Sequence, residues 1–354
     1  MRNNFLLTNF LCLLSLNIVA QTFSPVFNSG GTIKNSKSMI VGDFDGDDYK
    51  DIAITSNTPN SRLAVFESTE DNEYDEVFTI NAPVMKSIAY GDTDNDDYSE
   101  IIGFPVGSSV FQIVMFENTG DNQFVERSID ISEEGCTQCQ SSKVMVADLD
   151  MDEKMEIIFS YESPSGAIGS KLFIYEHDTI AGINHYSKVY EFATAIDASI
   201  DGFTIGDSDN DGQKEILLDI YNGTIVRLEN NGDNSFVLKS ANFNTSMSMR
   251  DLHVSDVDMD GDNELMLVGK PTGNSSGRII IFESPTDDQY VEDFVLDGIG
   301  TLINRVNAFS DGEFSFILLG RFDGIVDILE YQNQNYSSVL TCLLYTSPSP
   351  RDRG

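Results

Sequence analysis

The sequence of 354 residues predicts an all-β protein, a β-propeller built from four-stranded antiparallel blades. A nine-residue acidic motif, with carboxylates at positions one, three, five and nine, occurs five times and starts at Asp43, Asp92, Asp148, Asp207 and Asp256. Successive starts are 49, 56, 59 and 49 residues apart, a period typical of propellers and solenoids. Each motif lies between apolar segments rich in β-branched residues, and such segments favour strands.

The first two predicted strands of each repeat flank the acidic motif. The first ends at or near the residue before the motif, at 38–42, 87–91, 144–147, 203–206 and 252–255. The second begins at the ninth residue of the motif, at 51–55, 100–104, 156–160, 215–219 and 264–268. The acidic motif is therefore expected to be the loop of a β-hairpin.

Two further strands complete the repeat. The third predicted strand lies at 62–68, 112–118, 171–177, 224–230 and 278–284. A polar turn follows it, and the fourth predicted strand then starts with an aromatic residue: Tyr74, Phe124, Tyr186, Phe236 or Tyr290. Four antiparallel strands per repeat make one propeller blade, and propellers typically have about 4–8 blades.

A sixth repeat is present without its acids. Aligned on the apolar segment 316–320, its loop positions are Ala308, Ser310, Gly312 and Phe316, and residues 324–332 keep the third strand. We expect a sixth complete blade that folds without a cation. Residues 23–29 resemble a fourth strand, which predicts one strand of a seventh blade that would close the ring and cover its open edges.

The C-terminal residues break the repeat. Residues 342–352 match a transposase-type sequencing adapter read as protein. We therefore expect the propeller to occupy residues 21–341, with residues 342–354 as a non-native tail and the native chain continuing beyond about residue 341. A disordered linker rich in Ser and Pro is the alternative interpretation of this tail.

Residues 1–20 have the features of a secretory signal peptide. Arg2 supplies a positive charge, residues 5–19 form an interrupted apolar stretch, and the small residue Ala20 precedes the expected cleavage. This stretch is too short to span a membrane, and no later one is long enough. We expect a secreted or cell-surface protein, in which Cys136 and Cys139 form a local disulfide. A redox or metal-binding cysteine pair is the alternative.

The acidic loops predict calcium sites. Ca²⁺ takes about 6–8 oxygen ligands, and clustered carboxylates supply them. An EF-hand is excluded, because it needs a bidentate Glu at position twelve and helical flanks. Position twelve here is Ile54, Gly103, Phe159, Leu218 or Leu267, and the flanks are predicted strands.

The loops, their strand flanks and their period resemble FG-GAP-like calcium-binding propeller repeats, the integrin-α-type or VCBS family. The resemblance covers about residues 23–340. It is most specific at residues 207–215 and 256–264, where Gly212 and Gly261 occupy position six, which favours a left-handed backbone. The first three loops depart from it with Asp48, Asp97 and Glu153. Because Asp tolerates this geometry better than Glu, we expect the loop at Asp148 to be the weakest site.

We predict up to five Ca²⁺ ions, each held by the four acids of one loop and the carbonyl of position seven. The predicted ligands are Asp43, Asp45, Asp47, Tyr49 and Asp51; Asp92, Asp94, Asp96, Tyr98 and Glu100; Asp148, Asp150, Asp152, Lys154 and Glu156; Asp207, Asp209, Asp211, Gln213 and Glu215; Asp256, Asp258, Asp260, Asp262 and Glu264.

Composition narrows the partners. The chain has 58 acidic and 21 basic residues, a formal net charge of −37 that five Ca²⁺ would change to −27. Such a surface repels nucleic acids and anionic membranes. We expect neither as a partner.

We expect calcium to be mainly structural and the protein to be an exported binding or adhesion module for an extracellular protein or glycan. Regulation of ligand binding by calcium is an alternative role for the ions. No nucleophile elbow, phosphate loop or zinc signature is present, so no catalytic residue is predicted. A secreted propeller enzyme, or the substrate-docking domain of one, is the alternative function. Histidine, arginine and acids converging at the axial mouth would favour that alternative.

Overall fold

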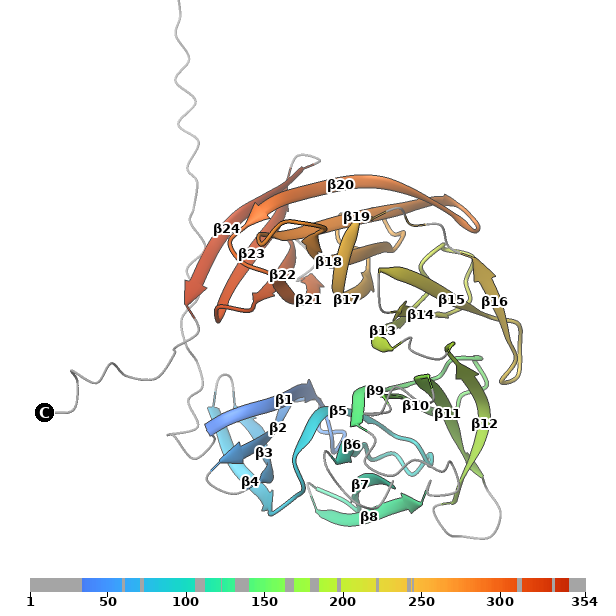
Figure 1. Cartoon of the computed structure of the whole chain (residues 1–354). Helices are drawn as coiled ribbons and strands as arrows, with labels where there is room; N and C mark the ends of the chain where they lie inside the picture. The colour runs from blue at the N-terminus through green and yellow to red at the C-terminus, as the bar shows by residue number, and fades with distance from the viewer. Residues whose placement is uncertain are drawn as a thin grey trace, which may run out of the picture.

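The computed structural model describes residues 34–58, 61–70, 73–105, 112–121, 123–130, 140–162, 169–178, 185–195, 199–220, 223–240, 243, 245–310, 314–332 and 335–343. These residues form 24 strands in six four-stranded sheets. The sheets follow one another around a ring in chain order, from blue to red in Figure 1. The fold is therefore a β-propeller with six described blades, as the sequence predicts.

The first three blades contain the strands before residue 194. They are β1 (Lys34–Gly42), β2 (Asp51–Thr58), β3 (Arg62–Glu70) and β4 (Glu73–Ile80); β5 (Met85–Gly91), β6 (Glu100–Pro105), β7 (Gln112–Asn118) and β8 (Phe124–Asp130); β9 (Gln140–Ala147), β10 (Glu156–Glu162), β11 (Lys171–Asp178) and β12 (His185–Ala193). In each sheet, strands that follow one another in the chain pair antiparallel.

The last three blades repeat the same order. They are β13 (Ile200–Gly206), β14 (Glu215–Ile220), β15 (Thr224–Asn230) and β16 (Phe236–Ser240); β17 (Met247–Ser255), β18 (Glu264–Pro271), β19 (Gly277–Thr286) and β20 (Gln289–Ile299); β21 (Ile303–Ser310), β22 (Ser315–Arg321), β23 (Ile325–Gln332) and β24 (Asn335–Leu343). The last strand, β24, ends two residues beyond the predicted propeller boundary at residue 341.

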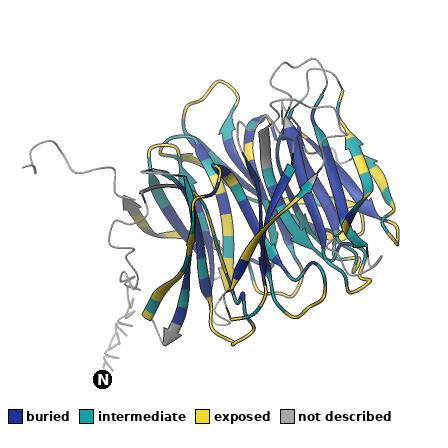
Figure 2. Ribbon diagram, turned by 90° about the horizontal axis from the view of Figure 1, so that it is seen from below, coloured by how far each residue is buried: buried dark blue, intermediate teal, exposed yellow. Residues whose placement is uncertain are grey.

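Burial follows the radial position of the strands. The first strands of consecutive blades contact one another from β1 and β5 through to β17 and β21. The second strands β6 and β14 are buried along their whole length, whereas the outermost strands β4 and β20 alternate between exposed and half-buried residues. Figure 2 shows the same gradient, with dark blue in the inner strands and yellow in the outer strands and loops.

Apolar cores join the blades in pairs. Five clusters each contain side chains from two consecutive blades, from blades one and two through to blades five and six. The sixth cluster contains only residues of the first blade, around Ala64 and Phe66. Among the described residues, no core cluster joins the first blade to the sixth.

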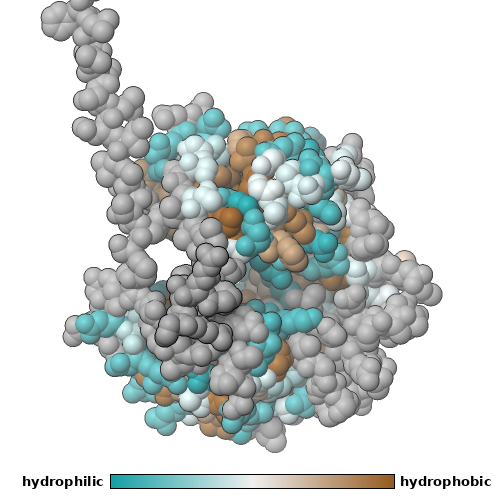
Figure 3. All heavy atoms as spheres, turned by 60° about the vertical axis from the view of Figure 1, so that its left-hand side comes forward, coloured by the Kyte–Doolittle hydropathy of each residue, from teal (hydrophilic) through white to brown (hydrophobic). Residues whose placement is uncertain are grey.

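Apolar side chains are exposed on these two end blades. Met39 and Val41 of β1 are 61% and 50% exposed, and Phe309 of β21 is 43% exposed. Figure 3 views the side of the ring where the two end blades lie and shows apolar brown residues exposed among teal hydrophilic ones.

The sixth blade corrects one alignment. Ala308 and Ser310, expected in a loop, belong to strand β21, whereas Phe316 lies in β22, as expected for position nine. Ser310 pairs with Ser315, so this hairpin is shorter than the acidic hairpins. Without the four acids, nothing in the sequence marked where the loop begins.

Several sequence predictions lie outside the described residues: the signal segment 1–20, the strand at 23–29, Gly312, the cysteine pair Cys136 and Cys139, and residues 344–354. No helix in the described part of the chain is long and apolar enough to cross a membrane.

Candidate metal centres in the acidic loops

Each acidic loop connects the first and second strands of blades one to five. The ninth position is the first residue of the second strand, and it pairs with the residue that precedes the loop: Asp51 with Gly42, Glu100 with Gly91, Glu156 with Ala147, Glu215 with Gly206 and Glu264 with Ser255. Because both residues of each pair belong to the sheet, this pairing holds the ninth acid at the base of the loop.

The five loops share one hydrogen-bond network, which begins at position two. Its backbone N–H donates to the acid at position nine: Phe44 to Asp51 (3.2 Å), Thr93 to Glu100 (2.7 Å), Leu149 to Glu156 (2.7 Å), Ser208 to Glu215 (2.8 Å) and Val257 to Glu264 (2.6 Å). These bonds use one oxygen of each glutamate, so the other oxygen faces the loop interior.

The acids at positions one and five hold the loop backbone. The N–H of position six donates to position one: Asp48 to Asp43 (3.0 Å), Asp97 to Asp92 (3.0 Å), Glu153 to Asp148 (3.3 Å), Gly212 to Asp207 (2.9 Å) and Gly261 to Asp256 (3.1 Å). The N–H of position seven donates to position five: Tyr49 to Asp47, Tyr98 to Asp96, Lys154 to Asp152, Gln213 to Asp211 and Asp262 to Asp260, at 2.8–3.0 Å. That the position-seven carbonyls bind metal stays a prediction.

Two positions of each loop have positive φ. Position six was predicted from its glycines, and it has φ of +73° to +102° in all five loops, including +74° at Glu153. Position four, with φ of +61° to +81°, was missed. It is occupied by Gly46, Asn95, Met151, Asn210 and Met259, and methionine gives no turn signal. The two bends turn successive carboxylates toward one point.

Buried oxygen atoms without hydrogen-bond partners mark the loop interiors. Glu100, Glu156 and Glu215 are 0% exposed and Glu264 is 1% exposed, and Oε1 of each has no hydrogen-bond partner among the described residues. The same holds for one buried carboxylate oxygen of Asp94, Asp150, Asp209 and Asp256. Buried polar atoms are nearly always paired in proteins, so these oxygens fit the donor set of a hard cation.

In four of the loops the carboxylates are close enough to share one ion. Ligand atoms lie within 4.8 Å of one another in three complete sets of four acids: Asp92, Asp94, Asp96 and Glu100; Asp207, Asp209, Asp211 and Glu215; Asp256, Asp258, Asp260 and Glu264. In the first loop, Asp43, Asp45 and Asp51 form a set of three. The structure therefore brings together most of the predicted carboxylate ligands.

A glutamate on the third strand was missed by the sequence analysis. Glu67 of β3 lies within 4.8 Å of Asp45 and Asp121 in a further acidic group. Burial, followed by repulsion from Asp258 and other acids, raises the pKa of Glu283 of β19 to about 7. A glutamate recurs at this place in every repeat, after an aromatic residue or leucine, which is the signal that could have revealed it.

Lys154 supplies a positive charge to the third loop. Its Nζ donates to Asp152 (2.8 Å) and to Glu176 of β11 (2.5 Å). The sequence predicted only the carbonyl of Lys154 as a ligand. A lysine beside Asp152 of the loop and the neighbouring Glu176 opposes metal binding there, which is a second reason, besides Glu153, to expect the weakest site.

Arg227 forms a buried charged cluster beside the fourth loop. It is 2% exposed and lies in β15, at the place that other repeats fill with an apolar residue. Its Nη1 donates to Asp209 and to the Tyr290 hydroxyl (3.1 Å). Its Nη2 pairs with Glu229 (3.0 Å) and Asp288. Asp209 is thus held by a guanidinium through Oδ2 and keeps Oδ1 free for a metal.

Each loop is also held by the next blade. The Tyr186 hydroxyl of β12 lies 2.7 Å from Thr93 Oγ1, and the Tyr290 hydroxyl of β20 lies 2.6 Å from Ser208 Oγ. This contact gives the tyrosine at the start of these two fourth strands a role in holding the loop before it. Side-chain amides at the ends of two third strands donate to loop carbonyls, from Asn118 to Phe44 and from Asn230 to Leu149.

Adjacent loops contact one another directly as well. Lys214 Nζ of the fourth loop donates to the carbonyl of Asp148 in the third (2.8 Å). Asn263 Nδ2 of the fifth loop donates to the carbonyl of Asp207 in the fourth (2.9 Å). The position-eight side chain of one loop therefore holds the position-one backbone of the loop before it.

With calcium removed, the stability of the protein should fall as the pH rises from about 5 to about 8. Burial raises the pKa of Glu100, Glu156 and Glu215 from 4.5 to about 8, and that of Glu264 to about 9. Between these pH values the folded protein holds protons that the unfolded chain releases, so each rise in pH favours unfolding.

Urea midpoints at pH 5, 6, 7 and 8 in EDTA measure this slope. Glu215→Gln should make it shallower, because that side chain no longer titrates. Saturating calcium should also make it shallower, because the ion replaces the protons. A urea midpoint in EDTA that is constant or rises with pH would contradict the raised pKa values of the buried glutamates.

Comparison of the chain with protein-family models found no match, and comparison with curated proteins found none either.

Proposed function

We propose that this protein is a calcium-stabilised β-propeller that is exported and serves as a binding or adhesion module for an extracellular protein or glycan. The observation that carries the proposal is the set of buried carboxylate oxygens without hydrogen-bond partners, repeated in the acidic loops. The loop pattern supports assignment to the FG-GAP-like family, and residues 1–20 support export.

Calcium is the cation that this donor set fits best. The predicted ligands are all oxygens, which suit hard cations such as Ca²⁺ and Mg²⁺. Mg²⁺ demands near-ideal octahedral geometry and keeps several waters, whereas each loop is predicted to supply four carboxylates and a carbonyl to one ion. The ions would neutralise acids that repel one another within a small volume, and so would hold each hairpin against its neighbouring blade.

Counting the bound ions tests the proposal. Equilibrium dialysis of the whole chain against calcium, followed by elemental analysis, should give five ions, with four bound more tightly than the fifth. Lys154→Gln should tighten the weakest site, because it removes the competing ammonium from Asp152. Lys188→Gln is the matched control, since Lys188 of the same blade pairs with Glu191 away from the loop.

Fewer than three calcium ions per chain, or equal binding of magnesium, would contradict calcium as the resident ion. An unchanged weakest site in Lys154→Gln would contradict competition by the lysine. Neither result depends on identifying the binding partner.

One observation bears on the alternative function, a secreted propeller enzyme. A pocket between the fourth and fifth blades is lined by two acids and an arginine, but by no histidine. The lining therefore meets only part of the expectation for a catalytic site, and a binding role accounts for it without a nucleophile.

A further inference from the structure

The pocket between the fourth and fifth blades lies at the end of the propeller opposite the acidic loops. It has a volume of about 340 Å³ and is lined by Asp201, Asp219, Gly223, Met247, Ser248, Met249, Arg250 and Thr272. These residues come from the starts of β13 and β17, the end of β14, and the turns after β14 and β18. The pocket is therefore separate from the candidate calcium sites.

Two strand irregularities direct charged residues to the pocket. The register between β13 and β14 shifts between Ile200 and Gly202, which leaves Asp201 outside the regular pairing. The register between β17 and β18 shifts between Met249 and Asp251, which leaves Arg250 outside the regular pairing. Bulges of this kind change where a side chain points and are common beside functional sites. The charges thus occupy equivalent places on neighbouring blades.

Asp219 is a buried acid whose bonding is incomplete. It is 1% exposed, and its Oδ2 has no hydrogen-bond partner in the described part of the structure. Burial and the nearby Asp201 raise the pKa of Asp219 to about 8, although the positive charge of Arg250 acts in the opposite direction. A buried oxygen facing a pocket is poised to accept a hydrogen bond from a ligand.

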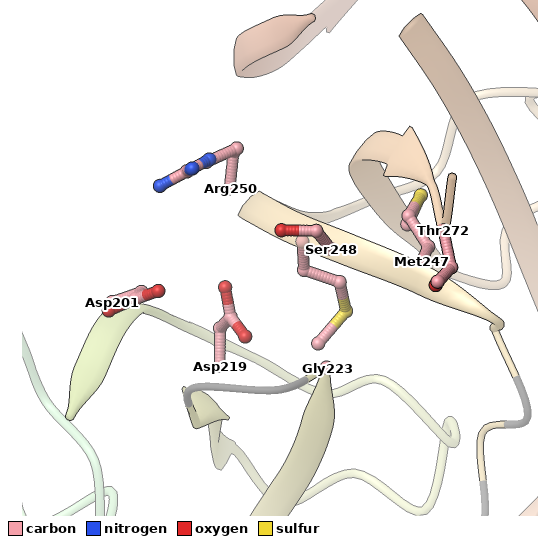
Figure 4. A pocket seen from close by; sticks show the side chains of 8 residues that line it. Asp201, Asp219, Gly223, Met247, Ser248, Arg250 and Thr272 are labelled. Atoms are coloured by element: carbon pink, nitrogen blue, oxygen red, sulfur yellow. The ribbon is translucent and has the colours of Figure 1, made fainter. Parts of the chain in front are cut away.

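The opposite wall of the pocket is positive. Figure 4 shows the carboxylates of Asp201 and Asp219 on one side of an open space, and the guanidinium of Arg250 with the Ser248 hydroxyl on the facing side. Arg250 is exposed, and no ion pair or hydrogen bond of its side chain is found among the described residues. Asp201 accepts a hydrogen bond from Ser199 Oγ (2.8 Å) and is thereby held in place.

This charge arrangement selects for a ligand with two opposite charges. A simple cation would be attracted by the acids and repelled by Arg250. A simple anion would be attracted by Arg250 and repelled by the acids. The buried side chains of Met247 and Met249 offer an apolar, adaptable surface between the two. No aromatic residue lines the pocket, so the stacking that sugars favour is absent from this lining.

We propose that this pocket binds a free apolar α-amino acid, with the ammonium group on Asp219 and Asp201 and the carboxylate on Arg250. The aliphatic side chain would lie against Met247 and Met249. The volume is within the range of about 300–1,000 Å³ of small-ligand sites. Because an ammonium group favours the ionised form of Asp219, binding near neutral pH should release a proton.

Three ligands with similar aliphatic skeletons test the contributions of the ammonium group and the carboxylate separately. Calorimetric titration of the whole chain in saturating calcium would compare L-leucine with 3-methylbutylamine, which lacks the carboxylate, and with 4-methylpentanoate, which lacks the ammonium. L-leucine should bind at least tenfold more tightly than either analogue. Repeating the titration at pH 7 in two buffers of different ionisation enthalpy should show proton release.

Two variants assign the charges to residues. Asp219→Asn and Arg250→Gln should each weaken leucine binding at least tenfold, and Asp233→Asn, in an exposed turn of the same blade, should not. Circular dichroism establishes that each variant is folded. The proposal is wrong if folded wild-type protein shows no leucine binding at 10 mM, if the amine alone binds as tightly as leucine, or if both pocket variants bind leucine like the wild type.

Discussion

Chelation of calcium should lower the melting temperature of this protein by about 15–20 °C. Each ion that binds only the folded state contributes about 2.7 kcal/mol at a hundredfold excess over its Kd. Five such sites would together contribute about 13 kcal/mol. With an unfolding entropy of about 2.1 cal/mol/K per residue, each kcal/mol corresponds to about 1.5 °C for a chain of this size. The effect is large because the four carboxylates of each loop repel one another once the ion has left.

The measurement is a melting curve in calcium, in EDTA, and in EDTA followed by excess calcium. Elemental analysis of each sample must accompany it, because a trapped ion would hide the effect. Recovery of the original curve on adding calcium back shows that loss of the ion is the cause. An unchanged melting curve in a sample shown to contain no metal would contradict stabilisation by calcium. The loop acids would then be ordinary surface charges.

Asp209→Ala should destabilise the protein by about 3 kcal/mol even in EDTA, where no ion is bound. The substitution removes a carboxylate from the buried guanidinium of Arg227, and breaking a buried ion pair costs about 3–5 kcal/mol. The value should lie at the lower end of this range, because Glu229 and Asp288 still contact Arg227.

The matched control is Asp258→Ala, at the same position of the fifth loop. Among the described residues, Asp258 forms no ion pair with an arginine, and it accepts a hydrogen bond from the Tyr331 hydroxyl (3.3 Å). In EDTA this substitution should cost less than about 1 kcal/mol, because it also relieves repulsion among acids. Urea unfolding of both variants, with and without calcium, separates the two effects. Equal losses in EDTA would contradict a special role for Arg227.

The sequence predicted the fold because the acidic motif marks each repeat. Carboxylates at fixed spacing locate the hairpin loop, and the strands on either side follow from their apolar character. Prediction failed where the marker is missing. In the sixth blade, Ala308 and Ser310 extend a strand that the alignment had ended, since no acid indicated the true turn.

Within the loops, side chains were easier to predict than backbone. Gly212 and Gly261 indicated the left-handed position six, and the structure extends it to Asp48, Asp97 and Glu153. Position four has the same handedness, but only Gly46, Asn95 and Asn210 are residue types that favour positive φ, and the two methionines hide the pattern. The neighbours of each loop were missed for a different reason, because Arg227 and Tyr290 approach it from other strands.

The pocket of Asp201, Asp219 and Arg250 could not be predicted at all. Its residues are separated by up to 49 positions in the chain and belong to two sheets. They meet because two bulges shift the pairing by one residue, and such shifts leave no trace in apolar periodicity. Only the register of the strands places these three charges around one space.

The contacts from each loop to the following blade have a direction. Blade two holds the first loop, blade five holds the fourth, and Tyr331 of the sixth blade holds Asp258 of the fifth. The loops therefore behave as a one-dimensional array with nearest-neighbour coupling, in which an event at one unit is felt first by the adjacent ones. The sixth blade has no acidic loop motif, yet through Tyr331 it holds the last acidic loop, so a blade can support a neighbouring loop without having such a loop itself.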